Sequence, residues 1–274
     1  MLTLLLPKNV LRTTALAALC GLLSVANPVF AEAVSPIPKV TEGFRFAVTP
    51  YVWTPHVNGS LDYNNTQIAE VSMSTGTILK SLSAGAMLNG TMHYGRWGLM
   101  GNATYAKLKP PGVHANLKEE GVTVDANTDL WMGVYTLAGT YTAYAGDTVY
   151  LDLLAGARFL NLNTKTDLDA SVAQLGYSKD TTLYSGLNAT DAVAGAQGRI
   201  RLGGSRFFVP FYLDAGGGSA VAKFTSQQIL GVGYTFDALD MMLVYNNIYY
   251  SLNKNQYSAY INMGGPAVAA TFRF

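Results

Sequence analysis

The sequence predicts an all-β protein whose antiparallel strands close into a transmembrane barrel of about twelve strands, with ten or fourteen as the alternatives. Three observations predict this fold. Apolar and polar residues alternate over many segments, the connections between them alternate between short and long, and the chain ends in the alternating stretch Ala267–Phe274. A terminal aromatic is typical of outer-membrane barrels, whose assembly machinery reads it, so Phe272 and Phe274 are the expected assembly signal.

The first 31 residues form a predicted secretory signal. Lys8 and Arg12 give its basic start, and residues 13–26 are apolar but too short to span a bilayer. Cleavage is expected after Ala31, with a cut two residues later as the alternative. The signal contains the only cysteine, Cys20, so the mature protein is expected to have no disulfide and no thiol nucleophile. Residues 32–42 are expected to form a flexible periplasmic lead-in to a single barrel domain over residues 43–274.

The composition excludes several classes of protein. Charged residues are only 13% of the 274, while Gly (28) and Tyr (17) are frequent. Removing Lys8 and Arg12 from the 18 basic residues leaves 16, against 17 acidic ones, which gives no electrostatic case for nucleic acid. After the signal, no apolar run approaches the roughly 18 residues of a membrane-spanning helix. A periplasmic β-protein and a membrane barrel remain.

The strands are expected where apolar and polar residues alternate. On residues 149–159 one face is apolar, and the other carries Tyr150, Asp152 and Arg158. A membrane barrel turns the apolar face to lipid and the polar face to the lumen. Further candidates, in order, are Phe44–Trp53, Ala84–Tyr94, Gly98–Leu108, Leu130–Tyr144, Ala192–Leu202, Phe207–Ala215, Thr225–Phe236, Met241–Tyr250 and Ala267–Phe274, with shorter strands at Ser60–Tyr63 and Thr66–Met73 around an Asn64-Asn65 turn.

The connections give the direction of the barrel. They are short at residues 95–97, 145–147, 203–205 and 237–239, and long at 109–129, 161–191 and 251–258. Outer-membrane barrels have short periplasmic turns and long external loops, so both chain ends are expected in the periplasm. The β pattern is interrupted near residues 76–83, where we expect a short helix that caps the wall or folds into the lumen; a loop turn is the alternative.

Aromatic residues are expected at the lipid interfaces. Trp131 and Tyr141 lie ten residues apart on one strand face, which is about the span of a tilted transmembrane strand. A sugar-binding aromatic surface is the alternative interpretation. The candidates for the lipid-facing girdles are Trp131, Tyr141, Phe224, Tyr234, Phe236, Phe272 and Phe274.

Several short segments together resemble a group of proteobacterial outer-membrane β-barrel proteins of poorly defined function. The resemblance covers most of the mature chain and implies the barrel and its outer-membrane location, but no catalytic residues. The expected Trp or Asp near Thr190 and Asp191 is only partly represented. The matching segments are Pro50–Trp53 followed by Gly59, Ile78-Leu79, Leu82, Ala86-Met87, Gly95–Leu99, Ala155–Arg158, Asp214–Gly217, Gly231–Tyr234 and Gly265–Phe274.

The sequence gives little support for catalysis or metal binding. The three histidines, His56, His93 and His114, fit no metal motif and are expected at the surface or an interface. His56 and Ser60 are the nearest His–Ser pair and have no third member for a hydrolase triad. We therefore expect no catalytic residue, no metal site, no cofactor and no enzymatic activity.

The charged residues on predicted inward faces are the candidate functional residues. They either select anionic solutes or neutralise one another across neighbouring strands. Their balance is five Arg against two Asp: Arg45, Asp152, Arg158, Arg199, Arg201, Asp214 and Arg273. The leading hypothesis is a narrow porin-like channel for small solutes with a bias toward anions. A non-conducting structural or surface-interaction barrel is the alternative, and a lipid-modifying enzyme comes third. A monomer is expected, with outer-membrane lipids and the assembly machinery as partners.

Overall fold

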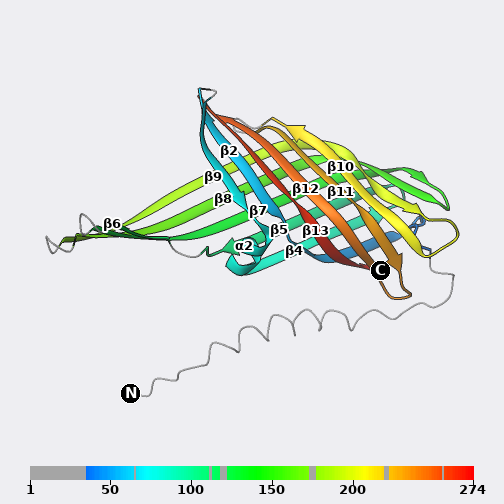
Figure 1. Ribbon diagram of the computed structural model, residues 1–274. Helices are drawn as coiled ribbons and strands as arrows, with labels where there is room; N and C mark the ends of the chain where they lie inside the picture. Colours follow the sequence, from blue (N-terminus) through cyan, green and yellow to red (C-terminus); the bar gives the residue numbers. More distant parts are fainter. Residues whose placement is uncertain are drawn as a thin grey trace, which may run out of the picture. The chain divides into compact units, whose positions relative to one another are not determined.

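A computed structural model describes residues 35–64, 66–110, 113–117, 122–172, 177–218, 222–254 and 256–274. The predicted secretory signal and its cleavage site lie outside the described residues. Val34–Arg273 forms one compact unit, which contains the whole barrel (Figure 1). No helix among the described residues is long and apolar enough to cross a membrane.

Ten antiparallel strands form a closed ring. They are β1 (Phe44–Trp53), β4 (Leu82–Tyr94), β5 (Trp97–Leu108), β7 (Val122–Ala145), β8 (Val149–Val172), β9 (Tyr177–Arg201), β10 (Phe207–Gly217), β11 (Ala222–Thr235), β12 (Asp240–Lys254) and β13 (Tyr257–Arg273). Each pairs with the next, and pairing of β1 with β13 closes the ring. The predicted antiparallel barrel is therefore confirmed, at the lower of the expected strand numbers.

Two short strands outside the ring account for the difference between its ten strands and the expected twelve. β1 pairs with the C-terminal half of β13, which is the periplasmic half in the orientation expected from the short turns, as far as Trp53↔Ala267. β2 (His56–Tyr63) resumes that pairing at His56↔Gly264. β3 (Thr66–Met73) pairs with β2. Pro55 lies at the interruption between β1 and β2, where its missing N–H cannot contribute to a ladder. The β2–β3 hairpin is thus an addition to the ring.

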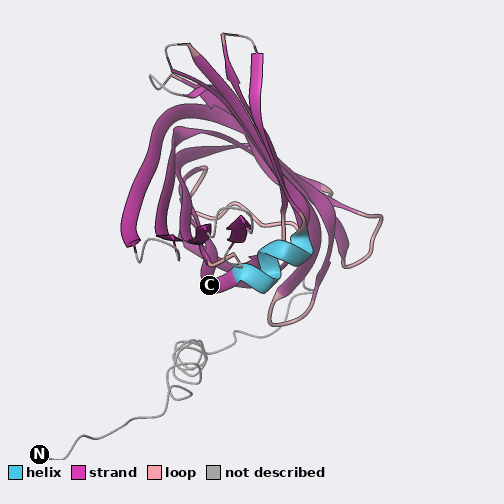
Figure 2. Cartoon of the chain, turned by 60° about the vertical axis from the view of Figure 1, so that its left-hand side comes forward, coloured by secondary structure: helices cyan, strands magenta, loops and turns pink. Residues whose placement is uncertain are grey.

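A single short helix follows this hairpin among the described residues. α2 (Thr75–Ser81) leads from β3 to β4 and is capped by Ser74, whose hydroxyl accepts a hydrogen bond from the Thr77 N–H at 3.2 Å. The helix lies beside the strands of the wall (Figure 2). It confirms the helix expected near residues 76–83.

Two of the expected long external loops are mostly strand. β7 and β8 have 24 residues each and β9 has 25, so all three continue well beyond the length that crosses a membrane. β6 (Val113–Leu117) pairs with the external part of β7. The prediction of loops at 109–129 and 161–191 was wrong. Residues 161–172 still alternate, but one face is entirely polar and the other includes threonines, so the segment is as polar as a loop.

The outward face carries a lipid-facing belt between two groups of aromatic residues. At the periplasmic end, the ring centroids of Trp97 and Tyr141 lie 4.9 Å apart and those of Phe207 and Tyr234 lie 4.8 Å apart. At the external end, those of Tyr249 and Tyr260 lie 6.5 Å apart. Exposed aliphatic side chains fill the band between them, among them Leu99, Leu153, Leu213 and Val268. This arrangement is typical of transmembrane barrels.

The polarity of the wall reverses at the external interface, as β8 shows. Within the belt its outward side chains are apolar up to Phe159, and its inward ones include buried Asp152 and Arg158. Beyond Phe159, the outward Asn161 hydrogen-bonds Asn188, while the inward Leu160 is buried. Above the lipid the outer face meets water, so apolar side chains can be buried only on the inside. The lumen therefore has a polar periplasmic half and an apolar external half.

Candidate functional site

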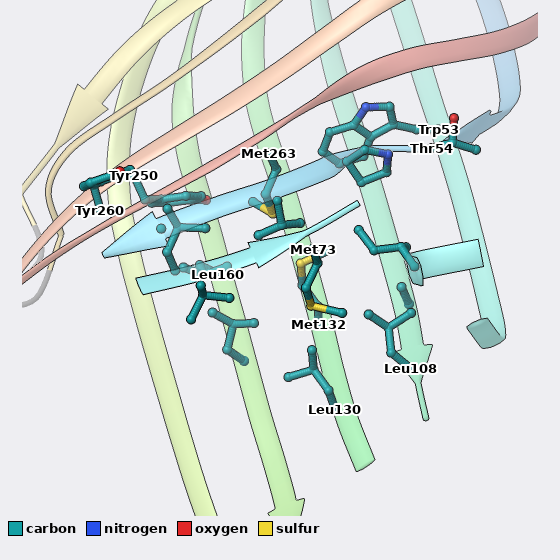
Figure 3. Close-up of a pocket in the computed structure, with 18 of the residues that line it drawn as sticks. Trp53, Thr54, Met73, Leu108, Leu130, Met132, Leu160, Tyr250, Tyr260 and Met263 are labelled. Carbon is teal, nitrogen blue, oxygen red and sulfur yellow. The ribbon is translucent and has the colours of Figure 1, made fainter. Parts of the chain in front are cut away.

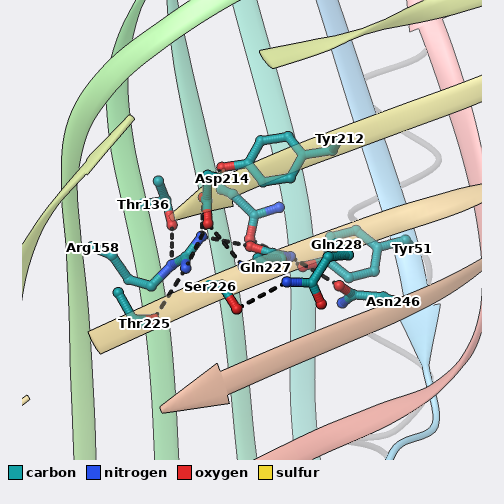
Figure 4. Close-up of polar contacts among 11 residues, drawn as sticks. Tyr51, Thr136, Arg158, Tyr212, Asp214, Thr225, Ser226, Gln227, Gln228 and Asn246 are labelled. Carbon is teal, nitrogen blue, oxygen red and sulfur yellow. Dashed lines mark hydrogen bonds and ion pairs between the residues drawn. The ribbon is translucent and has the colours of Figure 1, made fainter. Parts of the chain in front are cut away.

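Arg158 is the centre of the polar half of the lumen. It is fully buried, and its five N–H donors all have acceptors (Figure 4). Two of them go to the carboxylate of Asp214 on β10, as a bidentate ion pair that passes over the intervening β9. The remaining acceptors are the Thr136 and Thr225 hydroxyls, each at 3.3 Å, and Gln227 Oε1 at 2.8 Å.

The same layer extends to neighbouring strands. Asp214 also accepts from the Tyr212 hydroxyl and, at 2.9 Å, from the backbone N–H of Gln227. The Gln227 amide donates to Asn246 at 3.0 Å. Because buried Arg158 and Asp214 have their hydrogen-bonding capacity met by protein groups, this layer connects β7, β8, β10, β11 and β12 and leaves no free charge on these two residues for a solute.

A second ionic cluster lies toward the periplasmic end. Asp240 is fully buried and pairs with both Arg199 and Arg273. The same two arginines donate to the backbone of the predicted lead-in: Arg199 to Pro36 O at 3.2 Å, and Arg273 to Ser35 O at 3.1 Å. Ile37 beside them is only 4% exposed. This part of the lead-in is therefore bound to the barrel's inward-facing arginines.

His93 belongs to a third cluster and is not at the surface. It is 6% exposed, and its Nε2 lies 3.1 Å from both Asp152 Oδ2 and the Thr140 hydroxyl. Asp152 also accepts from Thr142 at 2.7 Å. The expectation of a surface or interfacial His93 was wrong. His93 on β4 is the register partner of Arg45 on β1, and both side chains face the lumen. We call these three clusters together the polar plug.

The remaining predicted site residues are spread over the periplasmic half. Arg45 donates to Gly95 O at 3.2 Å and lies 6.0 Å from the centre of the Tyr150 ring. Arg201 is the register partner of inward Phe208 but lies at the periplasmic rim, where it donates to the Ser205 and Gly204 carbonyls, both at 2.8 Å, and so caps the β9–β10 turn.

Two buried acids were missing from the predicted set. Asp191, the register partner of Arg158, and Asp240 are both 0% exposed. With them, the inward charges are four Asp (152, 191, 214, 240) and five Arg (45, 158, 199, 273, and 201 at the rim), so the expected excess of five Arg over two Asp is reduced to one charge among the described residues. Asp240 begins β12 in phase with inward Val244 and Asn246, a signal that could have found it.

An apolar cavity of about 310 Å³ occupies the external half of the lumen. Buried Trp53, Leu160 and Tyr250 line its periplasmic side, next to the polar plug. Met73, Leu108 and Met132 line it from three other strands (Figure 3). An engineered apolar cavity of about 150 Å³ holds a benzene molecule, so this one has room for a larger ligand.

Several apolar side chains that line this cavity are exposed. Leu61, Leu82, Leu79 and Val71 are 36%, 41%, 50% and 53% exposed, respectively, although each borders the cavity. A water-exposed surface normally avoids such contiguous apolar exposure, and where it occurs it marks a ligand-binding groove or a surface that contacts protein or membrane. The cavity is therefore accessible and can bind apolar groups. The described residues contain no cluster of three or more His, Cys, Asp or Glu suited to a metal ion.

Comparisons with known proteins agree with the fold. No protein-family model matches the chain, and no curated protein matches its sequence. The outer membrane protease OmpT from Escherichia coli is similar over 87% of this chain and 99% of that chain, at 9% identity and a TM-score of 0.50. The chain folds as a bacterial outer-membrane β-barrel.

Weaker similarities involve other outer-membrane barrels. The attachment invasion locus protein Ail of Yersinia pestis matches over 85% of this chain and 100% of that chain, at 11% identity and a TM-score of 0.31. The transport unit of the autotransporter AIDA-I from Escherichia coli matches over 94% and 96%, at 12% identity and a TM-score of 0.35. At these identities the comparisons show the fold alone.

Proposed function

We propose that this outer-membrane barrel is a receptor for small apolar molecules, which it binds in the external cavity. The observation that supports the proposal is the exposure of the apolar side chains lining that cavity, such as Leu79 and Val71. A bound apolar molecule would remove them from water. The polar plug closes the lumen beneath the ligand.

The expected affinity is modest. A ligand the size of an aromatic side chain buries roughly 150–250 Å². At about 25 cal/mol per Å², this contributes about 4–6 kcal/mol, from which the cost of association is subtracted, so a ligand of this size is expected to bind with a dissociation constant of about 1 mM or weaker. Binding of this strength suits a receptor that must release its ligand again.

A channel for small anionic solutes is the second proposal, and it requires an open path through the lumen. Conduction requires the polar plug to open, since Arg158, Arg199 and Arg273 are paired with buried carboxylates. Planar-bilayer recording separates the two proposals. We expect no steady current from the refolded protein; an anion-selective current that Arg158→Ala alters would favour the channel.

We propose that the protein has no enzymatic activity. His93 contacts a hydroxyl and a carboxylate through the same Nε2, so it cannot accept a proton from Thr140 while Asp152 orients its other nitrogen. The alternative to a receptor or a channel is a non-conducting structural or surface-interaction barrel, which binds no small molecule and acts through its external strands.

Fluorescence of Trp53 tests ligand binding directly. The chain has three Trp residues, so a Trp97→Phe/Trp131→Phe background leaves Trp53 at the cavity as the single reporter. Titration of 1-bromonaphthalene, whose heavy atom quenches tryptophan on contact, should give saturable quenching. The variant Ala106→Phe fills the cavity from β5 and should weaken binding at least tenfold.

Ala103→Phe is the matched control. Ala103 lies on the same strand but on the opposite face, because residues an odd number apart on a strand face opposite sides. It should leave quenching unchanged. Non-saturable quenching that is equal in both variants would mean that the probe only dissolves in the surrounding detergent or lipid, and the receptor proposal would be wrong.

A further inference from the structure

The wall of the barrel is not closed by strand pairing at one place. β1 pairs with β4 from Phe44↔Tyr94 to Pro50↔Leu88, and beyond Leu88 the remaining residues of β4 pair with β5 alone. On the other side of this gap, β3 pairs with β2 alone among the described strands. We call this gap the seam. Residues 52–55 and β3 form its first side, and residues 82–87 form its second side.

The seam is filled by side chains and by helix α2. The Trp53 backbone N–H, which would otherwise continue the ladder, donates to Met87 Sδ at 3.2 Å. The Thr75 hydroxyl at the start of α2 is 3.1 Å from Pro55 O and 3.4 Å from Thr54 O. At the end of the helix, Ser81 O accepts from the Lys109 N–H at 2.7 Å. Few interactions therefore hold α2 to the first side of the seam.

The seam joins the cavity to the lipid-facing belt. Ile78, Leu79, Leu82 and Met87 belong to the seam or to α2, and all four line the cavity. Just below them on the outward face, Val52 is 65% exposed and Leu88 46% exposed. A continuous apolar surface thus runs from the cavity, past α2, to the level of the outer leaflet.

The other ways out of the cavity are unfavourable for an apolar molecule. Toward the periplasm it would have to separate Arg158 from Asp214, and leaving such a charge unpaired costs about 3–5 kcal/mol. Toward the exterior it would enter water and lose the transfer free energy gained on binding. Through the seam it stays in apolar surroundings, and a seven-residue helix is too short to be stable by itself.

We propose that the seam is a lateral portal through which small apolar molecules exchange between the external cavity and the outer leaflet of the membrane, with α2 as the part that moves. The proposal rests on the proposed receptor function. It adds the source of the ligand, which is the bilayer.

A removable cross-link across the seam tests the portal. Thr54→Cys and Thr75→Cys, in a Cys20→Ser background, place two thiols where the Thr75 side chain already contacts the Thr54 backbone. Closing the pair, by disulfide or by a short bismaleimide, should fix α2 to the β1 side; mass spectrometry verifies closure. The probe is hexafluorobenzene in lipid nanodiscs, whose exchange between lipid and cavity is measured by ¹⁹F NMR.

We expect the closed pair to slow exchange at least tenfold relative to the same variant with open thiols, with the bound fraction unchanged. Asp62→Cys/Gln67→Cys is the control, because this register pair lies within the β2–β3 hairpin and does not cross the seam. Its closure should leave exchange unchanged. Equal exchange rates with the 54–75 pair open and closed would overturn the portal alone. Absence of any bound signal, even with open thiols, would overturn the receptor function.

Discussion

At the scale of single residues, Arg158 shows how a charge in a barrel lumen becomes structural. Its guanidinium binds side chains of β7, β10 and β11 at once, so it connects the neighbouring β7 with β10 and β11, which do not pair with β8. Two interpretations, a permeation surface and a cross-strand network, fit its position in the sequence. The filled set of acceptors favours the network.

We expect Arg158→Met to lower the free energy of unfolding by about 3–5 kcal/mol, because it leaves Asp214 buried without its cation. The double variant Arg158→Met/Asp214→Leu should recover most of this loss, since it removes both buried charges. Urea unfolding in detergent, followed by tryptophan fluorescence, measures both. Equal destabilisation of single and double variants would contradict the network interpretation.

The external carboxylates offer a test that depends on pH. Asp125, Asp169 and Asp180 are register partners on β7, β8 and β9. Partial desolvation, followed by repulsion from Asp180, raises the pKa of Asp169 above 3.8, whereas a hydrogen bond from Lys165 lowers the pKa of Asp167. A raised carboxyl pKa means that its contribution to stability is present below the ordinary value and is lost as pH rises through the folded pKa.

Asp180→Asn should therefore lower the pKa of Asp169 part of the way to its ordinary value, because the desolvation remains. The carboxyl ¹³C resonance of Asp169, followed against pH, measures the change. Asp167 is the internal reference and should titrate as before. An unaltered pKa of Asp169 would show that the Asp169 and Asp180 carboxylates do not interact.

At the scale of elements, close strand packing behind the ionic layer depends on glycine. Gly195 of β9 is the register partner of Asp214, and a Cβ on it would lie 2.1 Å from Leu213 O and 2.8 Å from Asp214 Cβ. The first of these atoms belongs to the backbone of β10 and cannot move without disturbing the ladder.

Gly195→Ala should lower the free energy of unfolding by about 1–3 kcal/mol, the usual cost of overpacking. Gly101→Ala on β5 is the matched control, because a Cβ there meets nothing within 4 Å. It should be neutral or slightly stabilising. Urea midpoints of the two variants give the comparison, and a neutral Gly195→Ala would mean that β9 and β10 can separate freely.

At the scale of the whole molecule, two halves of the lumen have opposite chemistry. The lipid determines this, because an outward face in hydrocarbon must be apolar and leaves the polar residues inside. Above the interface the relation is reversed, as Leu160 and Asn161 show. A polar plug and an apolar cavity therefore lie one above the other within a single ring of strands.

The C-terminal aromatic belongs to this scale because it concerns assembly of the whole barrel. Phe274 is 57% exposed, so few contacts of the folded protein depend on it. We expect Phe274→Ala to reduce the amount of folded protein in the outer membrane severalfold while leaving the urea midpoint unchanged. Phe236→Ala, at a similarly exposed aromatic (47%), should not reduce it. Heat-modifiable mobility on gels measures the folded fraction, and equal yields would argue against the assembly signal.

The sequence by itself determined the class of fold, the antiparallel order and the short turns, since all of these follow from alternation and turn residues that are local in the chain. It left the segment near residues 76–83 open between a short helix and a loop turn, and the structure decided for the helix. The sequence also placed Arg158, Asp152 and Asp214 on inward faces, because residue parity along a strand decides the face. It could not decide whether these charges are free or paired, since a pair such as Arg158–Asp214 joins residues 56 positions apart, on strands that do not pair with each other. Nor could it reveal the cavity or the seam. Both depend on where ladders end, and Trp53 and Met87 meet there only once the barrel has closed.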